Sequence, residues 1–179
     1  LARERSVANA RGRSIGLVLL DLDGLKTVND SAGHQAGDQL ITALAETLRQ
    51  GLRARDTAYR IGGDEFAVVL QDETTWGAFR FAQRLQGTFA ARPAEQRLSA
   101  AAGVSASRGQ TRDELIHEAD LALIAAKRGR RGALIYTDDL SVREQGYDNP
   151  DRVDHRDLVS ASLARAADDA GWDTFVIPD

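Results

Sequence analysis

The 179-residue chain has no cysteine, no methionine and only 2 Trp, 3 Tyr and 5 Phe. Without cysteine it can form neither a disulfide nor a thiolate metal site, which fits a reducing compartment, and we expect a cytoplasmic location. No apolar run approaches the ~20 residues of a membrane span, so we expect no membrane contact by this fragment. Because the chain starts at Leu1 without a methionine, we expect a fragment of a longer protein, whose missing N-terminal regions can still carry a membrane anchor.

The net charge of −4 gives no basic surface for nucleic acid, so we predict no nucleic-acid partner. The charge is unevenly spread: residues 141–179 hold nine acidic residues and four arginines, a net charge of −5. Gly146, Asn149 and Pro150 accompany this change and predict a linker. We expect three parts: the end of a connecting helix (1–12), one domain (13–140) and an acidic C-terminal extension of unknown role (141–179).

Hydrophobic periodicity predicts helices alternating with strands in the central domain. We expect helices over residues 24–31, 38–52, 74–89 and 112–128, and strands over 15–20, 57–61, 66–70, 98–105 and 132–136. A further helix is expected over 156–170. The two central strands form a tight hairpin and must be antiparallel. The pattern therefore predicts an α+β fold with a mixed, largely antiparallel sheet flanked by helices.

Two carboxylates follow the first apolar run, at Asp21 and Asp23. Period-2 alternation would place both on one face of the strand. Carboxylates at the end of a buried strand must be paired, hydrogen-bonded or bound to a cation, because desolvating them otherwise is costly. One interpretation is a Mg²⁺ site with oxygen ligands. The alternative is that Asp23 caps the next helix.

The hairpin tip reads Ile61-Gly62-Gly63-Asp64-Glu65-Phe66. Glycines supply the φ > 0 geometry that such turns often need, and they let a ligand approach the backbone. The acidic pair alone is also compatible with a solvated loop. Together with Asp21, however, Asp64 or Glu65 could form a shared cation site.

These residues resemble the GGDEF family of diguanylate cyclases, which make cyclic di-GMP from GTP. Gly62 to Phe66 is the family signature. The segment from Asp21 to Lys26, followed by Asn29-Asp30, Gly33-His34 and Gly37-Asp38, resembles the family's metal and guanine segment in order and spacing. Ala119-Asp120, Ala122-Leu123 and Ala126-Lys127 resemble its late helix. The resemblance covers roughly residues 13–137 and implies a palm-like core.

The resemblance implies that Asp21, Asp64 and the Leu22 carbonyl bind Mg²⁺ or Mn²⁺, with Glu65 a further ligand or the catalytic carboxylate. It implies that Asn29 and Asp38 hold guanine, with His34 beside the nucleotide. Adenine has no N1–H or 2-amino group, so Asp38 favours GTP. The alternatives are that Asp38 is an N-cap and Asn29 a C-terminal turn residue.

Backbone N–H groups of Gly62 and Gly63 would face phosphate. The basic residues that could reach phosphate are Lys26, Lys127 and Arg131, although basic residues near a helix C-terminus are also favoured by its dipole. The family usually reads Lys-x-x-Gly-Arg, whereas this chain has Lys127-Arg128-Gly129-Arg130-Arg131, so the acting arginine stays open.

Arg53 and Asp56 end six positions before Gly62, where the family carries its product-inhibition site. The alternative is a simple i,i+3 ion pair. Because the product is two-fold symmetric, we expect catalysis by a homodimer. The resemblance thus implies a GTP-dependent, product-inhibited diguanylate cyclase. Two other interpretations are an inactive GGDEF module that binds GTP or cyclic di-GMP and signals by contact, and a polymerase-like palm, which the charge balance disfavours.

Overall fold

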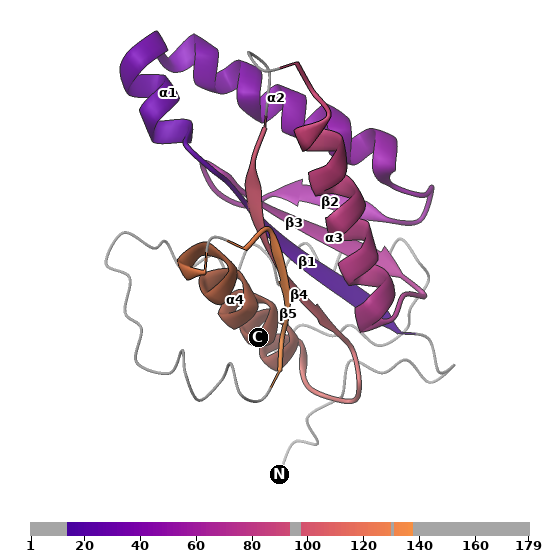
Figure 1. Ribbon diagram of the computed structural model, residues 1–179. Coiled ribbons are helices and arrows are strands. Elements are labelled where there is room, and N and C mark those ends of the chain that lie inside the picture. Colours follow the sequence, from indigo (N-terminus) through magenta and orange to yellow (C-terminus); the bar gives the residue numbers. More distant parts are fainter. Residues whose placement is uncertain (1–13, 94–97, 130, 138–179) are drawn as a thin grey trace, which may run out of the picture.

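The structure is a computed structural model that describes residues 14–93, 98–129 and 131–137. The connecting helix expected over 1–12 and the acidic extension, with its expected helix, lie outside the described residues. The described part contains nine elements (Figure 1): β1 (Ile15–Leu22), α1 (Leu25–Ala32), α2 (His34–Gly51), β2 (Thr57–Arg60), β3 (Glu65–Gln71), α3 (Thr75–Ala90), β4 (Ala100–Ala106), α4 (Arg112–Arg128) and β5 (Ala133–Ile135).

The five strands form one sheet in the order β2-β3-β1-β4-β5. The β2–β3, β3–β1 and β1–β4 pairs are antiparallel, and only β4–β5 is parallel. The predicted α+β fold with a mixed, largely antiparallel sheet is therefore confirmed. Strand β1 lies at the centre and is buried along its whole length, which agrees with its nearly continuous apolar sequence.

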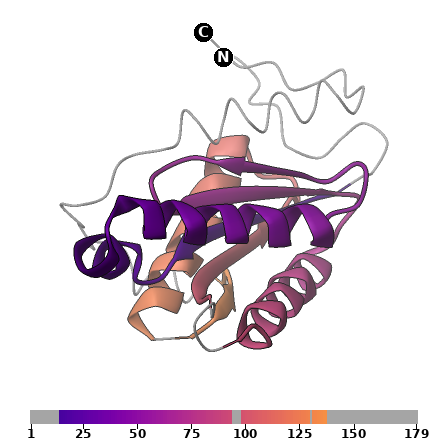
Figure 2. The ribbon, with the colours of Figure 1, turned by 90° about the horizontal axis from the view of Figure 1, so that it is seen from above.

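Helix α4 covers one face of the sheet, while α2 and α3 cover the other (Figures 1 and 2). Alternation along β1 divides its side chains between the two layers. Leu17 and Leu19 pack toward the α4 side with Leu115. Leu20 packs on the other side with Phe81. The central strand β1, which carries Asp21, is therefore packed on both faces.

The first two helices differ from the sequence prediction, because α2 begins at His34 rather than at Asp38. Gly33, with φ +83°, ends α1 and immediately precedes α2, so the two helices form one hairpin. This backbone conformation favours glycine. Asp38 lies inside α2, and the alternative that it caps the helix is wrong.

Helix α4 lies unusually close to β4 at Gly103. A Cβ atom added to Gly103 would lie 2.0 Å from the Ala119 carbonyl oxygen and 2.3 Å from the Leu123 nitrogen. Three alanines, Ala119, Ala122 and Ala126, are fully buried on this helix. The absence of a side chain at Gly103 thus lets the helix backbone approach the sheet.

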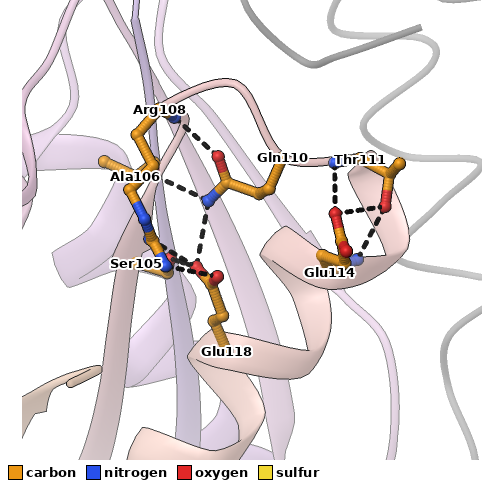
Figure 3. Close-up of polar contacts among 7 residues, drawn as sticks. All are labelled: Ser105, Ala106, Arg108, Gln110, Thr111, Glu114 and Glu118. Atoms are coloured by element: carbon orange, nitrogen blue, oxygen red, sulfur yellow. Dashed lines mark hydrogen bonds and ion pairs between the residues drawn. The ribbon is translucent and has the colours of Figure 1, made fainter. Parts of the chain in front are cut away.

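A polar cluster fixes the N-terminal half of α4 (Figure 3). The carboxylate of Glu118 accepts hydrogen bonds from Ser105 at 2.6 Å, from both terminal nitrogens of Arg108 at 2.8 and 2.6 Å, and from Gln110 at 2.9 Å. Just before it, Thr111 and Glu114 form a reciprocal capping box that starts the helix. These contacts tie α4 to the end of β4.

None of the helices in residues 14–93, 98–129 and 131–137 combines the length and the apolar character needed to cross a bilayer.

Candidate functional site

Two acidic side chains meet where β1 and β3 lie side by side. Asp21 of β1 is the direct antiparallel partner of Glu65 of β3. Side chains of directly opposite residues point to the same face, with Cβ atoms about 5 Å apart. The next residue of β1, Leu22, donates its amide to the Asp64 carbonyl at 2.9 Å. The sheet register therefore brings Asp21, Leu22, Asp64 and Glu65 together, as the sequence predicted.

The last turn of α4 adds a cation to these carboxylates. Lys127 Nζ lies 2.7 Å from Asp21 Oδ2, and the Asp21 side chain is only 8% exposed. Burial raises the pKa of Asp21 above its usual value, and this effect outweighs the hydrogen bond and charge of Lys127, which lower it. The nearby charges of Asp64 and Asp23 raise it further. Asp21 is thus a desolvated carboxylate that needs a positive partner.

The same acidic side chains also shift the pKa of Lys127. Its partial burial lowers the pKa of the ammonium, but the hydrogen bond to Asp21 and the charges of Asp21, Asp64 and Glu65 outweigh burial and raise it. Three carboxylates therefore act on one cationic atom. The ammonium marks where positive charge is favoured at this end of the sheet.

The sequence prediction for Asp23 is wrong on two points. Strand β1 ends at Leu22, so Asp23 does not share a strand face with Asp21. Asp23 does not cap α1 either: its carboxylate accepts a hydrogen bond from Ser99 Oγ at 2.6 Å, and the N-cap is Gly24 with φ +77°. A left-handed glycine turns the chain out of the strand, which leaves Asp23 facing the start of β4.

The signature turn is closed by its own backbone and by an arginine. The amides of Ile61 and Gly62 donate to the Glu65 carbonyl at 2.9 and 3.3 Å. Arg60 donates to the carbonyls of Gly62 and Gly63, the shortest bond being 2.7 Å. Sequence reasoning missed Arg60, although a guanidinium next to a glycine turn is a ready donor for its carbonyls.

The expectation that Gly62 and Gly63 supply positive φ angles is wrong, because neither is in the left-handed region. A Cβ atom at Gly63 would meet nothing within 4 Å. Gly63 can still serve the second expected role, which is to leave its backbone open to an approaching ligand.

The α1–α2 hairpin carries the residues expected at the nucleotide. Asn29 lies within α1 and its side-chain Oδ1 is buried with no hydrogen-bond partner in the described part of the chain. It faces Gly37 of α2, where an added Cβ would lie 2.0 Å from that oxygen. A buried acceptor without a donor costs stability. Asp38, His34 and Lys26 are exposed on the same hairpin.

Arg53 and Asp56 lie in the turn between α2 and β2, away from the carboxylates. Asp56 accepts hydrogen bonds from the backbone amides of Arg53 at 3.0 Å and Gln71 at 3.2 Å. The Arg53 guanidinium instead pairs with Glu73 at 3.3 Å. The alternative of a simple i,i+3 ion pair is therefore wrong. Gln71 and Glu65 are opposite ends of β3, so this turn lies about 20 Å from the acidic end.

Arg131 is exposed after α4, where its amide donates to the Ala126 carbonyl at 2.9 Å. Its position does not decide between the arginines of the 127–131 segment, because Arg130 lies outside the described residues.

The donor atoms at the acidic end of the sheet are of the kind that the expected divalent cation binds. Within the described ranges no group of three or more His, Cys, Asp or Glu side chains is already arranged to hold a metal ion. The chemistry nevertheless fits: the side-chain donors are hard oxygens, Asp21 is desolvated, and Lys127 stands in as the cation.

Residues 1–133 match the family described as "Diguanylate cyclase, GGDEF domain". The chain belongs to the GGDEF domain family. The resemblance seen in the sequence is thus confirmed. The domain is 36% identical over 140 residues to the bifunctional diguanylate cyclase/cyclic di-GMP phosphodiesterase MucR of Pseudomonas aeruginosa, a match that covers 74% of this chain and 20% of MucR. The chain therefore spans about a fifth of that relative.

Solved GGDEF structures share the fold. The GGDEF domain of DgcB from Caulobacter crescentus, solved with cyclic di-GMP, superposes with a TM-score of 0.65 at 28% identity and covers 72% of this chain and 80% of that one. The active GGEEF domain of a diguanylate cyclase from Vibrio cholerae gives a TM-score of 0.66 at 28% identity, covering 69% and 83%.

Proposed function

We propose that this GGDEF domain condenses two GTP molecules into cyclic di-GMP with release of two pyrophosphates. The observation that carries the proposal is the convergence of Asp21, Asp64 and Glu65 on one cationic position, the ammonium of Lys127. A triphosphate needs such a concentration of divalent-cation ligands at one end of a rigid sheet. Relatives named as diguanylate cyclases and a homologous structure with bound cyclic di-GMP support the same reaction.

Asp21, Asp64 and Glu65 would hold Mg²⁺ or Mn²⁺, together with the Leu22 carbonyl. A bound divalent cation neutralises phosphate charge when the 3′-hydroxyl of one GTP attacks the α-phosphorus of the other. The residues of the chain bind and orient the nucleotide. Gly63 leaves the turn backbone open to phosphate, and Lys26, Lys127 and Arg131 add positive charge.

The base would lie at the α1–α2 hairpin. The exposed Asp38 carboxylate can accept from the N–H groups of guanine, and a rotation of the Asn29 side chain would bring its Oδ1, buried in this structure, to a second bond. Adenine would leave these acceptors without donors, so the pair selects GTP over ATP. His34, at the start of α2, would lie beside the nucleotide.

The product requires two such sites face to face. One domain presents one nucleotide site, whereas cyclic di-GMP has two-fold symmetry. We therefore assign catalysis to a homodimer related by a two-fold axis. Arg53 and Asp56, at the far end of β3, would bind product and limit the reaction.

The test is to incubate the full chain with GTP and Mg²⁺ and to quantify cyclic di-GMP and pyrophosphate by chromatography and mass spectrometry. We expect two pyrophosphates per cyclic dinucleotide. Glu65→Gln should lower the rate on the order of 100-fold or more, because an acidic oxygen at the reaction centre is lost. Glu46→Gln, an exposed position of α2, is the matched control and should keep the wild-type rate.

An unchanged rate in Glu65→Gln would contradict the site assignment. Wild-type protein that binds GTP or cyclic di-GMP in calorimetry but forms no product would instead support the inactive binding module.

A further inference from the structure

The α1–α2 hairpin lines a cavity together with the turn after β1 and with Arg92. The cavity has a volume of about 720 Å³, which is within the range of small-molecule sites. Its walls come from the turn after β1, from both helices of the hairpin and from Arg92, which follows α3. Lys26, Asn29, His34 and Asp38 are not among its lining residues. The cavity is therefore distinct from the proposed GTP site.

Arg92 has an unusual hydrogen-bonding state. Its Nη1 donates to Thr47 Oγ1 at 3.1 Å, and Thr47 in turn donates its proton to the Ala43 carbonyl at 2.7 Å. The Nε atom of Arg92 is buried and has no acceptor among the residues that the structure describes. A buried N–H group without an acceptor costs stability. Thr47 thus anchors one edge of the guanidinium and leaves the Nε edge without a protein partner.

The Nε edge is one of the forks by which arginine binds two oxygens of one acceptor. Carboxylates and phosphates match this fork with two parallel hydrogen bonds. The neighbouring wall is apolar and is formed by Val28, Leu40 and Ala43. Asp23 also lines the cavity, and its carboxylate already accepts from Ser99. Its charge disfavours a second anionic group on that side.

We propose that this cavity binds a small anion, a carboxylate or phosphate carried on an apolar body. The oxyanion pairs with the guanidinium of Arg92, and the apolar body packs against Val28, Leu40 and Ala43. The proposal does not depend on the turnover of GTP, because it rests on residues outside the nucleotide site.

The probe is 4-(trifluoromethyl)benzoate, followed by ¹⁹F NMR during titration of the full chain. The neutral 4-(trifluoromethyl)benzamide is the matched probe without an oxyanion. We expect saturable binding of the benzoate, competition by inorganic phosphate and at least tenfold weaker binding of the benzamide.

Arg92→Gln should weaken benzoate binding at least tenfold, whereas Arg80→Gln, on the exposed surface of α3, should leave it unchanged. Ala32→Leu is a second variant, which narrows the cavity from an exposed position and keeps Arg92. It should also weaken binding and remains informative if Arg92→Gln fails to fold. Equal binding of the two probes, or benzoate affinity unaffected by Ala32→Leu and Arg92→Gln, would overturn the proposal.

Discussion

The Nζ atom of Lys127 lies 2.7 Å from Oδ2 of Asp21, although 106 residues separate the two in the sequence. The contact joins the last turn of α4 to the end of the central strand. It neutralises a buried carboxylate whose neighbours Asp64 and Glu65 are also acidic. The position of α4 on the sheet therefore determines the charge balance of the proposed active site.

The first prediction concerns the pH dependence of stability. Folding raises the pKa of Asp21 from 3.8, mainly through burial, so the folded state holds this proton more tightly than the unfolded state. The contribution of Asp21 to the free energy of unfolding is therefore largest below pH 3.8 and decreases as pH rises through the folded pKa.

Urea unfolding without divalent cations, compared between the wild type and Asp21→Asn from pH 3 to 8, checks this sign. The stability of the wild type relative to the variant should fall with rising pH. Asp30→Asn, at an exposed position of α1, is the control: the stability of the wild type relative to this variant should not fall in this way. A relative stability that rises with pH would contradict the assigned burial effect.

The second prediction uses two glycines of different surroundings. Gly103→Ala places a methyl group against the backbone of α4, so we expect a loss of about 3 kcal/mol or a failure to fold. Gly87→Ala lies on the exposed face of α3, where a Cβ meets nothing within 4 Å, and should stabilise by about 0.5–1 kcal/mol. Thermal and urea unfolding of both variants measure the contrast. Equal effects would show that α4 does not approach β4 so closely.

The third prediction concerns the Glu118 cluster. Arg108→Met removes two charge-assisted hydrogen bonds but leaves those from Ser105 and Gln110. We expect a loss of about 1–2 kcal/mol, reduced from a fully buried pair because the Arg108 side chain is 53% exposed. Arg80→Met on α3 is the control and should stay within about 0.5 kcal/mol of the wild type in urea unfolding. An Arg108→Met variant as stable as the control would argue against a structural role for this cluster.

The fourth prediction separates product binding from folding. Arg53→Ala should relieve inhibition by added cyclic di-GMP with little change in stability, because the Arg53 side chain is 61% exposed. Arg55→Ala, at 58% exposure, is the matched control and should remain inhibited. Initial rates at increasing cyclic di-GMP measure the effect. Inhibition that persists unchanged in Arg53→Ala would remove the assigned inhibitory site.

Asp56→Ala is the less suitable variant for that experiment. Its carboxylate accepts hydrogen bonds from two backbone amides, so its removal also loosens the turn between α2 and β2. We expect a loss of about 1 kcal/mol or more in urea unfolding.

Periodicity predicted the helices and strands of the described part well, because the longer elements each bury one face or two. The boundaries were less certain where the backbone rather than the side chains decides them. Gly33 with φ +83° allows α2 to begin four residues earlier than the Asp38 signal suggested. Strand β1 likewise ends at Leu22, so that Asp23 lies between the strand and the left-handed Gly24.

The sequence could predict that Asp21 and Glu65 are acidic residues at the ends of strands, since each ends or begins an apolar run. Their register could not be predicted, because it depends on how β1 pairs with β3. The contact of Lys127 with Asp21 depends in addition on the close approach of α4 at Gly103. Similarly, no local pattern indicates that Arg92 would lie beside the α1–α2 hairpin, because Thr47 reaches it across 45 residues.

The turn at Gly63 has a wider consequence. Its backbone angles are open to any L-residue and its surroundings leave room for a side chain. Folding therefore does not demand glycine there, whereas the proposed approach of a phosphate to the peptide would. If the proposed function holds, Gly63→Ala keeps the fold and loses turnover of GTP, because the added methyl group occupies only the space that the nucleotide needs.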